Sequence, residues 1–172
     1  MTTAREFIED LQRGQEVHFP GGPAVKLPQM TGPAIAQALL AVVPPLAPLN
    51  LPLMVSEREF WFIFSPYAHH VTVDVQEQPG PHFVTVNHAA YRIRSLTALT
   101  TQTRFQAAPR RTDLISATLI FAFPTAKPFE LTADYQGEDR TRLSPGNLLA
   151  FAQHLLLMSG RSGPFGLVGR KS

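Results

Sequence analysis

Apolar and polar residues alternate with two different periods along this chain. In the first fifty residues, and again after residue 143, apolar residues recur three and four positions apart, which is the spacing of one helix face. Between these regions they recur mostly at every second position, which is typical of strands with one buried face. The pattern therefore predicts an α+β chain whose helices lie toward its two ends.

The first helix is expected over residues 3–13. Thr3 and Glu6 have the spacing of a capping box, and the apolar residues of this segment share one face before Gly14 ends the helix. The sequence "PGGP" (20–23) then predicts a turn between two short extended pieces.

A second helix is expected over residues 33–43, with Thr31 as its cap and Pro33 in its first turn. It must end before Pro44–Pro45, and so few residues cannot span a bilayer, which takes about 20. Residues 44–55 are apolar and proline-rich, so we expect an extended connection there. A re-entrant or membrane-surface segment is the alternative.

About seven short strands are expected from residue 51 onward. The segment 57–64 is apolar on both faces, which predicts a central strand. Pro79–Gly80 suits a type II turn and predicts a hairpin between the strands on either side. In "YRIRSLTALT" (91–100) the apolar phase shifts after Arg94, which predicts a β-bulge. Two further strands are expected at 113–123 and 128–135.

The last helix is expected to begin at Ser144 and Pro145 and to end at Gly160. Its apolar face should pack on the sheet and consists of Leu148, Phe151, Ala152, Leu155 and Leu156. The basic, glycine-rich tail (160–172) is expected to be flexible.

We predict one α+β domain over residues 1–159, with a helical and proline-rich part (1–50) followed by a curved antiparallel sheet or partly open barrel with a capping helix (51–159).

Composition narrows the classes of protein that fit. The chain has 172 residues, of which 44% are hydrophobic, 16% are charged and none is cysteine. This indicates a packed core and excludes disulfides, thiolate nucleophiles and cysteine-based metal sites. The N-terminus lacks an apolar signal core, so we expect a cytoplasmic protein. Twelve arginines against three lysines, with much alanine, proline and leucine, suggest a GC-rich bacterial or phage genome.

Two adjacent histidines, His69 and His70, come nearest to a chemical motif. Strand alternation places them on opposite faces, so they cannot readily bind one metal ion. If Pro79–Gly80 is a two-residue hairpin loop, Val71 lies opposite His88, and His69 and His88 become diagonal neighbours about 7–8 Å apart by Cα. We interpret His69 and His88 as structural residues with hydrogen-bond partners; a metal-binding pair is the alternative.

Basic residues are unevenly distributed, although the formal net charge is only +2. No Asp or Glu occurs between residues 78 and 112, and arginine forks near Phe105 would suit phosphate groups or single-stranded nucleic acid. An anionic lipid surface, a protein partner and a plain solvated surface are the alternatives. The arginines concerned are Arg92 and Arg94, expected on one strand face, and Arg104, Arg110 and Arg111, expected in a loop.

The order of strands followed by one amphipathic helix is similar to that of pleckstrin-homology-like domains. The resemblance is carried by "YRIRSLTALT" (91–100) and by "PFELTADYQGEDRTRLSPGNLLAFAQHLL" (128–156), and it covers roughly residues 51–159. The second segment looks like the last strand and capping helix of small bacterial members. The resemblance implies a bent antiparallel sheet that closes on itself and a role in binding proteins or lipids, with no binding motif carried over.

We predict a non-catalytic interaction module that acts in a protein assembly, by self-association or as an adaptor. The sequence has no nucleotide-binding, serine-hydrolase or metalloprotease motif, so we expect no catalytic residue and no cofactor. A nucleic-acid-binding protein that uses the five arginines is the second hypothesis, and a histidine-based enzyme or metal site at His69 and His88 is the third. The candidate partner contacts are Leu46, Leu49, Leu51, Phe165, Leu167 and Val168.

Overall fold

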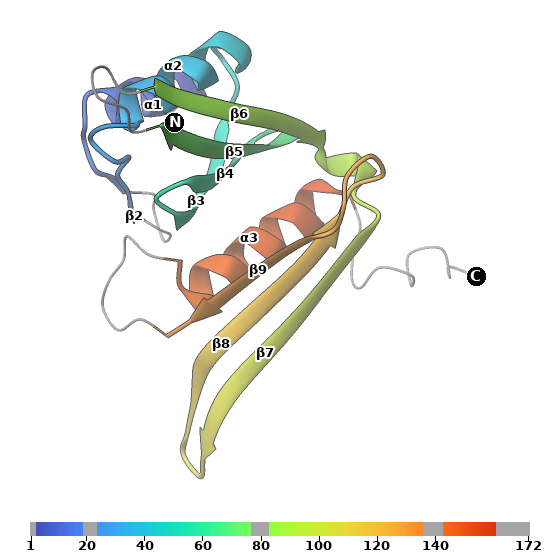
Figure 1. The fold of residues 1–172 in the computed structure, drawn as a ribbon. Helices are drawn as coiled ribbons and strands as arrows, with labels where there is room; N and C mark the ends of the chain where they lie inside the picture. Colours follow the sequence, from blue (N-terminus) through green and yellow to red (C-terminus); the bar gives the residue numbers. More distant parts are fainter. Residues whose placement is uncertain (1–2, 19–23, 77–82, 136–142, 161–172) are drawn as a thin grey trace. The chain divides into compact units, whose positions relative to one another are not determined.

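The structure is a computed structural model, and it describes residues 3–18, 24–76, 83–135 and 143–160. The chain divides into two compact units, Met1–Tyr91 and Arg92–Ser172. Within the described residues, three α-helices and several antiparallel sheets confirm the α+β class (Figure 1). That the two units form one domain over residues 1–159 stays a prediction.

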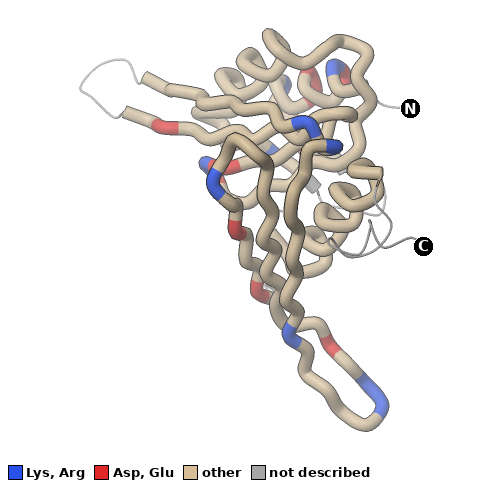
Figure 2. The backbone as a smooth tube through the Cα atoms, turned by 90° about the vertical axis from the view of Figure 1, so that its right-hand side faces the viewer, with Lys and Arg blue, Asp and Glu red and all other residues tan. Residues whose placement is uncertain are grey.

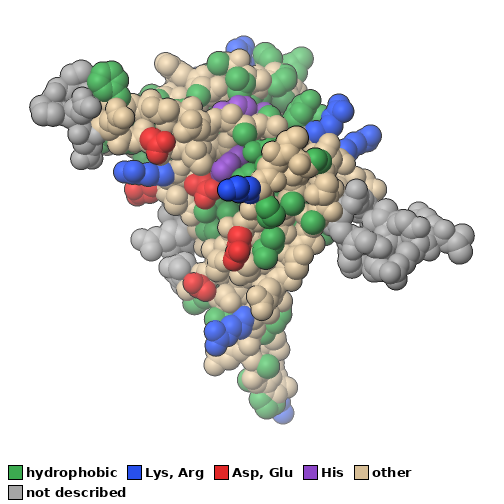
Figure 3. Space-filling model, turned by 45° about the vertical axis from the view of Figure 1, so that its right-hand side comes forward, with side chains coloured by type: hydrophobic (Ala, Val, Ile, Leu, Met, Phe, Trp, Pro, Cys, Tyr) green, Lys and Arg blue, Asp and Glu red, His purple; other side chains and the backbone are tan. Residues whose placement is uncertain are grey.

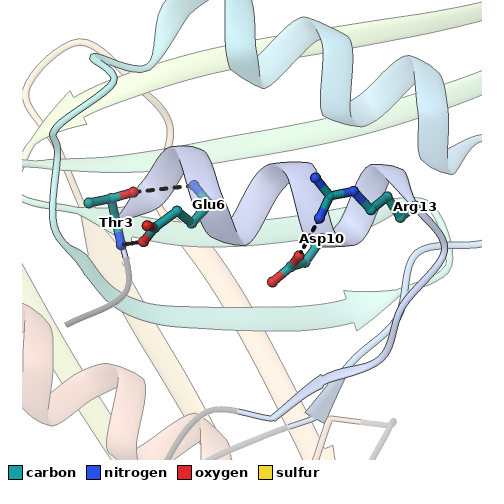
Figure 4. Close-up of polar contacts among 4 residues, drawn as sticks. All are labelled: Thr3, Glu6, Asp10 and Arg13. Atoms are coloured by element: carbon teal, nitrogen blue, oxygen red, sulfur yellow. Dashed lines mark hydrogen bonds and ion pairs between the residues drawn. The ribbon is translucent and has the colours of Figure 1, made fainter.

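In the first unit, α1 (Ala4–Gln12) begins with the capping box expected from the sequence. The Oγ1 atom of Thr3 accepts a hydrogen bond from the backbone N–H of Glu6 at 3.2 Å, and the Glu6 carboxylate accepts one from the backbone N–H of Thr3 at 2.8 Å (Figure 4). These bonds to Thr3, with the backbone bond contributing most, hold the pKa of Glu6 below its usual value. The helix ends at Gln12, and Gly14 follows it with a φ of +76°, which suits glycine.

The second helix, α2 (Gly32–Val42), has nearly the predicted bounds but not the predicted cap. Thr31 occupies the N-cap position without a side-chain hydrogen bond to the helix, and Pro33 sits in the first turn. Within the described residues, no helix combines the length and the apolar character needed to cross a membrane.

The described residues of the first unit form two sheets. The shorter one pairs β1 (Val17–His18) with β2 (Ala24–Val25), and the turn predicted at 20–23 lies outside the described residues. The larger one is four-stranded and antiparallel. Its strands follow one another in space as they do in sequence: β3 (Leu49–Ser56), β4 (Glu59–Phe64), β5 (Tyr67–Gln76) and β6 (Phe83–Arg92).

Strand β4 is an inner strand of this sheet, as the sequence predicts, and its side chains are buried on both faces. Phe60, Phe62 and Phe64 point to one face, because alternate residues of a strand share a face. Phe7 of α1 packs against this row, with its ring edge-on to Phe62 at 6.0 Å. The α1 helix therefore covers this face of the sheet.

The second unit contains a short 3₁₀ turn, η1 (Ile93–Ser95), followed by a three-stranded antiparallel sheet and a helix. The sheet orders β7 (Ala98–Ala108), β8 (Arg111–Ala122) and β9 (Phe129–Asp134). The helix, α3 (Pro145–Met158), lies along one face of this sheet (Figure 1).

The start and the packing face of α3 are confirmed. The Oγ atom of Ser144 accepts a hydrogen bond from the backbone N–H of Asn147 at 3.1 Å, and Gly160 follows the helix with a φ of +73°. The ring of Phe151 packs against Phe121 of β8 at 5.9 Å. Of the predicted apolar face, Leu148, Phe151, Ala152 and Leu155 are buried, and Leu156 is partly exposed.

Two predictions about the sheet are wrong. The sequence predicts one strongly curved sheet or partly open barrel of about seven strands. Within the described residues the number of strands from Leu49 onward is indeed seven, but they form two separate open sheets, of four and three strands, besides the β1–β2 pair. The bulge predicted after Arg94 is instead the turn η1, which separates β6 from β7. Ile93 and Leu96 are both buried around this turn, so the apolar phase shift marks a change of element.

Candidate functional site

The two longest strands of the described residues form a hairpin that extends beyond its own sheet. Strands β7 and β8 pair along their whole length, from Ala98 opposite Ala122 to Ala108 opposite Arg111. Strand β9 pairs with β8 only at Ser116–Phe121. We call residues 104–115 the hairpin arm, a two-stranded extension beyond the third strand (Figure 2).

Strand β7 is the exposed edge of this sheet. Of its eleven residues, Leu99 is partly covered and the other ten are exposed. In the part of the chain that the structure describes, β7 pairs on one side only, with β8. The pairing of β7 with β8 contains a β-bulge. The bulge lies in β8, where Ile115 is the extra residue between two successive cross-strand pairs. Strand β7 therefore presents an unbroken row of backbone groups to a further strand.

The hairpin arm combines basic and aromatic side chains. Phe105 is 52% exposed and lies next to Arg104. Figure 3 shows basic and hydrophobic side chains together toward the tip of the hairpin. Arg111 donates a hydrogen bond from Nε to Asp113 Oδ1 at 2.9 Å, and this bond raises the pKa of Arg111. With Arg110, the arm carries three arginines and one acid.

The five arginines predicted to form a basic site are divided between the two ends of β7. Arg92 ends β6 and Arg94 lies in η1, so they do not share one strand face, because the 3₁₀ turn interrupts the alternation. Arg104 lies in β7 rather than in a loop, Arg110 lies in the turn and Arg111 begins β8. At about 3.4 Å per residue, β7 spans roughly 34 Å, which separates Arg94 from Arg110.

The first histidine pair lies in the first unit and is hydrogen-bonded. His69 of β5 and His88 of β6 lie with Nδ1 and Nε2 2.8 Å apart and with their rings stacked at 5.1 Å. The predicted approach of these two residues is therefore confirmed, although the Pro79–Gly80 turn that suggested it lies outside the described residues. The rings of Phe64 and Tyr67 also lie beside His69, at 5.2 and 6.2 Å.

The surroundings of this pair favour neutral imidazoles. Burial, together with the neighbouring His88, lowers the pKa of His69 to about 4, and burial also lowers the pKa of His88. A nitrogen–nitrogen distance of 2.8 Å fits a hydrogen bond. A tetrahedral zinc ion, bound at about 2.0–2.1 Å by each nitrogen, would hold the nitrogens about 3.3 Å apart. The geometry therefore fits the structural interpretation of the pair.

A second pair lies on the opposite face of β5. His70 Nε2 and Glu59 Oε2 are 2.7 Å apart, and the ring of Trp61 stacks on His70 at 4.2 Å. Strand alternation alone does not predict this pair, because the contact depends on the register in which Trp61 lies opposite His70. Among the residues that the structure describes, no three His, Asp or Glu side chains come together in a way that could hold a metal ion.

The apolar residues predicted as partner contacts differ in exposure. Leu46 is 86% exposed between α2 and β3, and Leu49 is partly buried at the start of β3. Leu51 is only 1% exposed, so its assignment as a surface contact is wrong. The physical reason is that the expected proline-rich connection joins the sheet as β3 from Leu49 onward. Phe165, Leu167 and Val168 lie outside the described residues.

A cleft of about 440 Å³ lies in the first unit, where the end of α1 meets the start of α2. Arg13 and Lys26 contribute its basic lining, and Leu11, Leu27 and Pro33 contribute apolar atoms. These lining residues include neither a carboxylate nor a histidine, so they form no acid–base constellation.

Comparison with known proteins assigns this chain to no family: no family model, no curated protein and no solved structure matches it. The similarity to pleckstrin-homology-like domains therefore stays a prediction.

Proposed function

We propose that this protein is a non-catalytic interaction module and that β7, with the hairpin arm, is its contact element. One observation carries the proposal: β7 is an eleven-residue edge strand, and ten of its residues are exposed. An isolated two-stranded ribbon is at best marginally stable in water. A long edge strand is also a template for pairing with another chain. A partner that covers β7 would therefore stabilise the arm as it binds.

The side chains of the arm favour a protein partner. Phe105 supplies an exposed aromatic ring, Arg104 precedes it in β7, and Arg110 supplies a guanidinium group in the turn of the hairpin. Aromatic and arginine side chains are enriched at protein interfaces, where they often contribute most of the binding energy. An arm with this composition is suited to insert its aromatic residue into a partner while its arginines bind at the rim.

A nucleic-acid contact through the same arm is the second candidate function. A two-stranded ribbon fits the major groove of B-DNA, and arginine forks bind phosphate groups and guanine. Two observations make nucleic acid a less favoured partner than protein. Asp113 is paired with Arg111 and offsets its charge, and Arg92 and Arg94 lie away from the arm.

Photo-crosslinking at position 105 tests the leading proposal. Phe105→benzoylphenylalanine, introduced in the cells that produce the protein, is expected to cross-link it to protein. The matched control is the same substitution at Leu157, which is 75% exposed on α3. Equal cross-linking from the two positions, or none from position 105, would contradict the proposal. Cross-linking of position 105 to nucleic acid would favour the second candidate instead.

A further inference from the structure

The geometry points to a second copy of this chain as the partner of β7. In this inference the two β7 strands pair antiparallel about a two-fold axis at Gln102. It rests on the proposed role of β7 as the contact element. The pairing joins the sheets β7–β8–β9 of two copies into one six-stranded sheet, and it is isologous, because the same strand serves both copies.

Strand β7 lacks the features that usually keep an edge strand unpaired. Natural edges are protected by short length, lysine, proline, inward-pointing charges or bulges. The β7 sequence "ALTTQTRFQAA" has one charged residue, Arg104, and neither lysine nor proline. Its eleven residues are about twice the mean strand length of 5–6. The one bulge of the hairpin lies in β8, so it does not turn the outer edge of β7 away from a partner.

The side chains of β7 complement themselves in one register. With Gln102 on the axis, Leu99 lies opposite Phe105, Thr101 opposite Thr103, and Arg104 opposite Thr100. Aromatic–aliphatic and Thr–Thr pairs are favourable cross-strand neighbours, whereas directly opposed like charges are unfavourable. Moving the axis to Thr101 or Thr103 removes both Leu99–Phe105 pairs, and moving it to Arg104 places the two arginines opposite each other.

The same register also extends an apolar row that exists within one copy. Leu99 lies opposite Phe121 of β8, and the ring of Phe121 packs against Phe151 of α3. Because cross-strand neighbours share a face, Phe105 of the second copy would lie beside Leu99 on the face that α3 covers. An exposed aromatic ring would thus gain an apolar neighbour in each copy.

Disulfide scanning tests the register directly, because the sequence contains no cysteine. The purified full chain with Gln102→Cys is expected to form a covalent dimer under mild oxidation, since a residue on the axis faces its own copy at about 4.5–5.5 Å by Cβ. Mixing a Thr101→Cys chain with a Thr103→Cys chain should give a covalent heterodimer. Thr132→Cys, exposed on the other edge strand β9, is the matched control and should form no covalent dimer.

Light scattering of the unmodified protein gives an independent result. We expect twice the chain mass of 19.0 kDa, and Phe105→Glu should restore the single-chain mass while circular dichroism reports a folded protein. A monomeric protein whose position 105 still cross-links another protein in cells would overturn this inference and leave the proposed function standing. A monomeric protein whose position 105 cross-links no protein would overturn both this inference and the proposed function. A covalent dimer of the Thr132→Cys chain would also overturn the inference. The same holds if the protein is a monomer that binds labelled duplex DNA.

Discussion

Replacing Phe62 with alanine is expected to destabilise the first unit by about 3–5 kcal/mol. Phe62 is fully buried in β4, and the rings of Phe7, Phe60 and Phe64 surround it at centroid distances of 6.0, 6.3 and 5.6 Å. Removing the ring leaves a cavity between β4 and α1, because close-packed neighbours relax only partly into such a space. The loss is a large share of the roughly 5–15 kcal/mol that stabilises a typical protein.

Urea denaturation followed by tryptophan fluorescence measures this loss. Trp61 is the one tryptophan of the sequence and adjoins Phe62 in β4, so its emission reports unfolding of the first unit. The matched control is Phe83→Ala, which makes the same chemical change in β6 at a residue that is 57% exposed. Followed by circular dichroism, it should alter stability by no more than roughly 0.5 kcal/mol. Equal losses from the two variants would contradict the burial assigned to these phenylalanines.

Acidification from pH 7 to pH 4 is expected to lower the stability of the first unit by about 3 kcal/mol through His69. The pKa of His69 is about 4 in the folded protein, below its ordinary value of 6.5, so the unfolded chain binds a proton more readily in this range. The part of the stability that depends on a neutral His69 is therefore fully present above pH 6.5 and is lost as the pH falls toward 4. The lowered pKa of His88 acts in the same direction.

Urea midpoints measured at several pH values between 7 and 4 test this expectation. Removing both titrating groups with His69→Gln and His88→Gln together should flatten the dependence, since two amides can still form a hydrogen bond. His154→Gln, which removes a histidine from α3, serves as the control and should keep the dependence of the unmodified protein. An unchanged dependence in the double variant would mean that the pair does not link folding to pH.

Local sequence signals predicted the ends of the helices well. The caps of α1 and α3 depend on residues three positions apart, such as Thr3 with Glu6 and Ser144 with Asn147, so each can be recognised without the rest of the chain. The division into two sheets could not be predicted in this way. A phase shift after Arg94 is equally compatible with a bulge and with a 3₁₀ turn, and only pairing between distant strands decides between them.

In the candidate sites, too, local sequence patterns predict some contacts, whereas others depend on the pairing of strands. Alternation along β5 and a short turn were enough to predict that His69 and His88 approach each other. The contact between Glu59 and His70 depends on the register of β4 and β5, which alternation alone does not determine. The sequence pattern predicts a loop for the arginines from Arg104 to Arg111. In the structure Pro109 lies in the turn of the hairpin, and the strands continue on both sides of it.

Hydrogen exchange of the β7 backbone tests most directly whether β7 is a free edge that a second copy covers. In dilute protein, we expect the amides of Ala98–Ala108 that are not bonded to β8 to exchange rapidly. They should become protected as the protein concentration rises, while the outer amides of β9 (Phe129–Asp134) remain unchanged. Exchange from β7 that stays rapid at every concentration, or protection that appears equally on β9, would contradict the central role assigned to this strand.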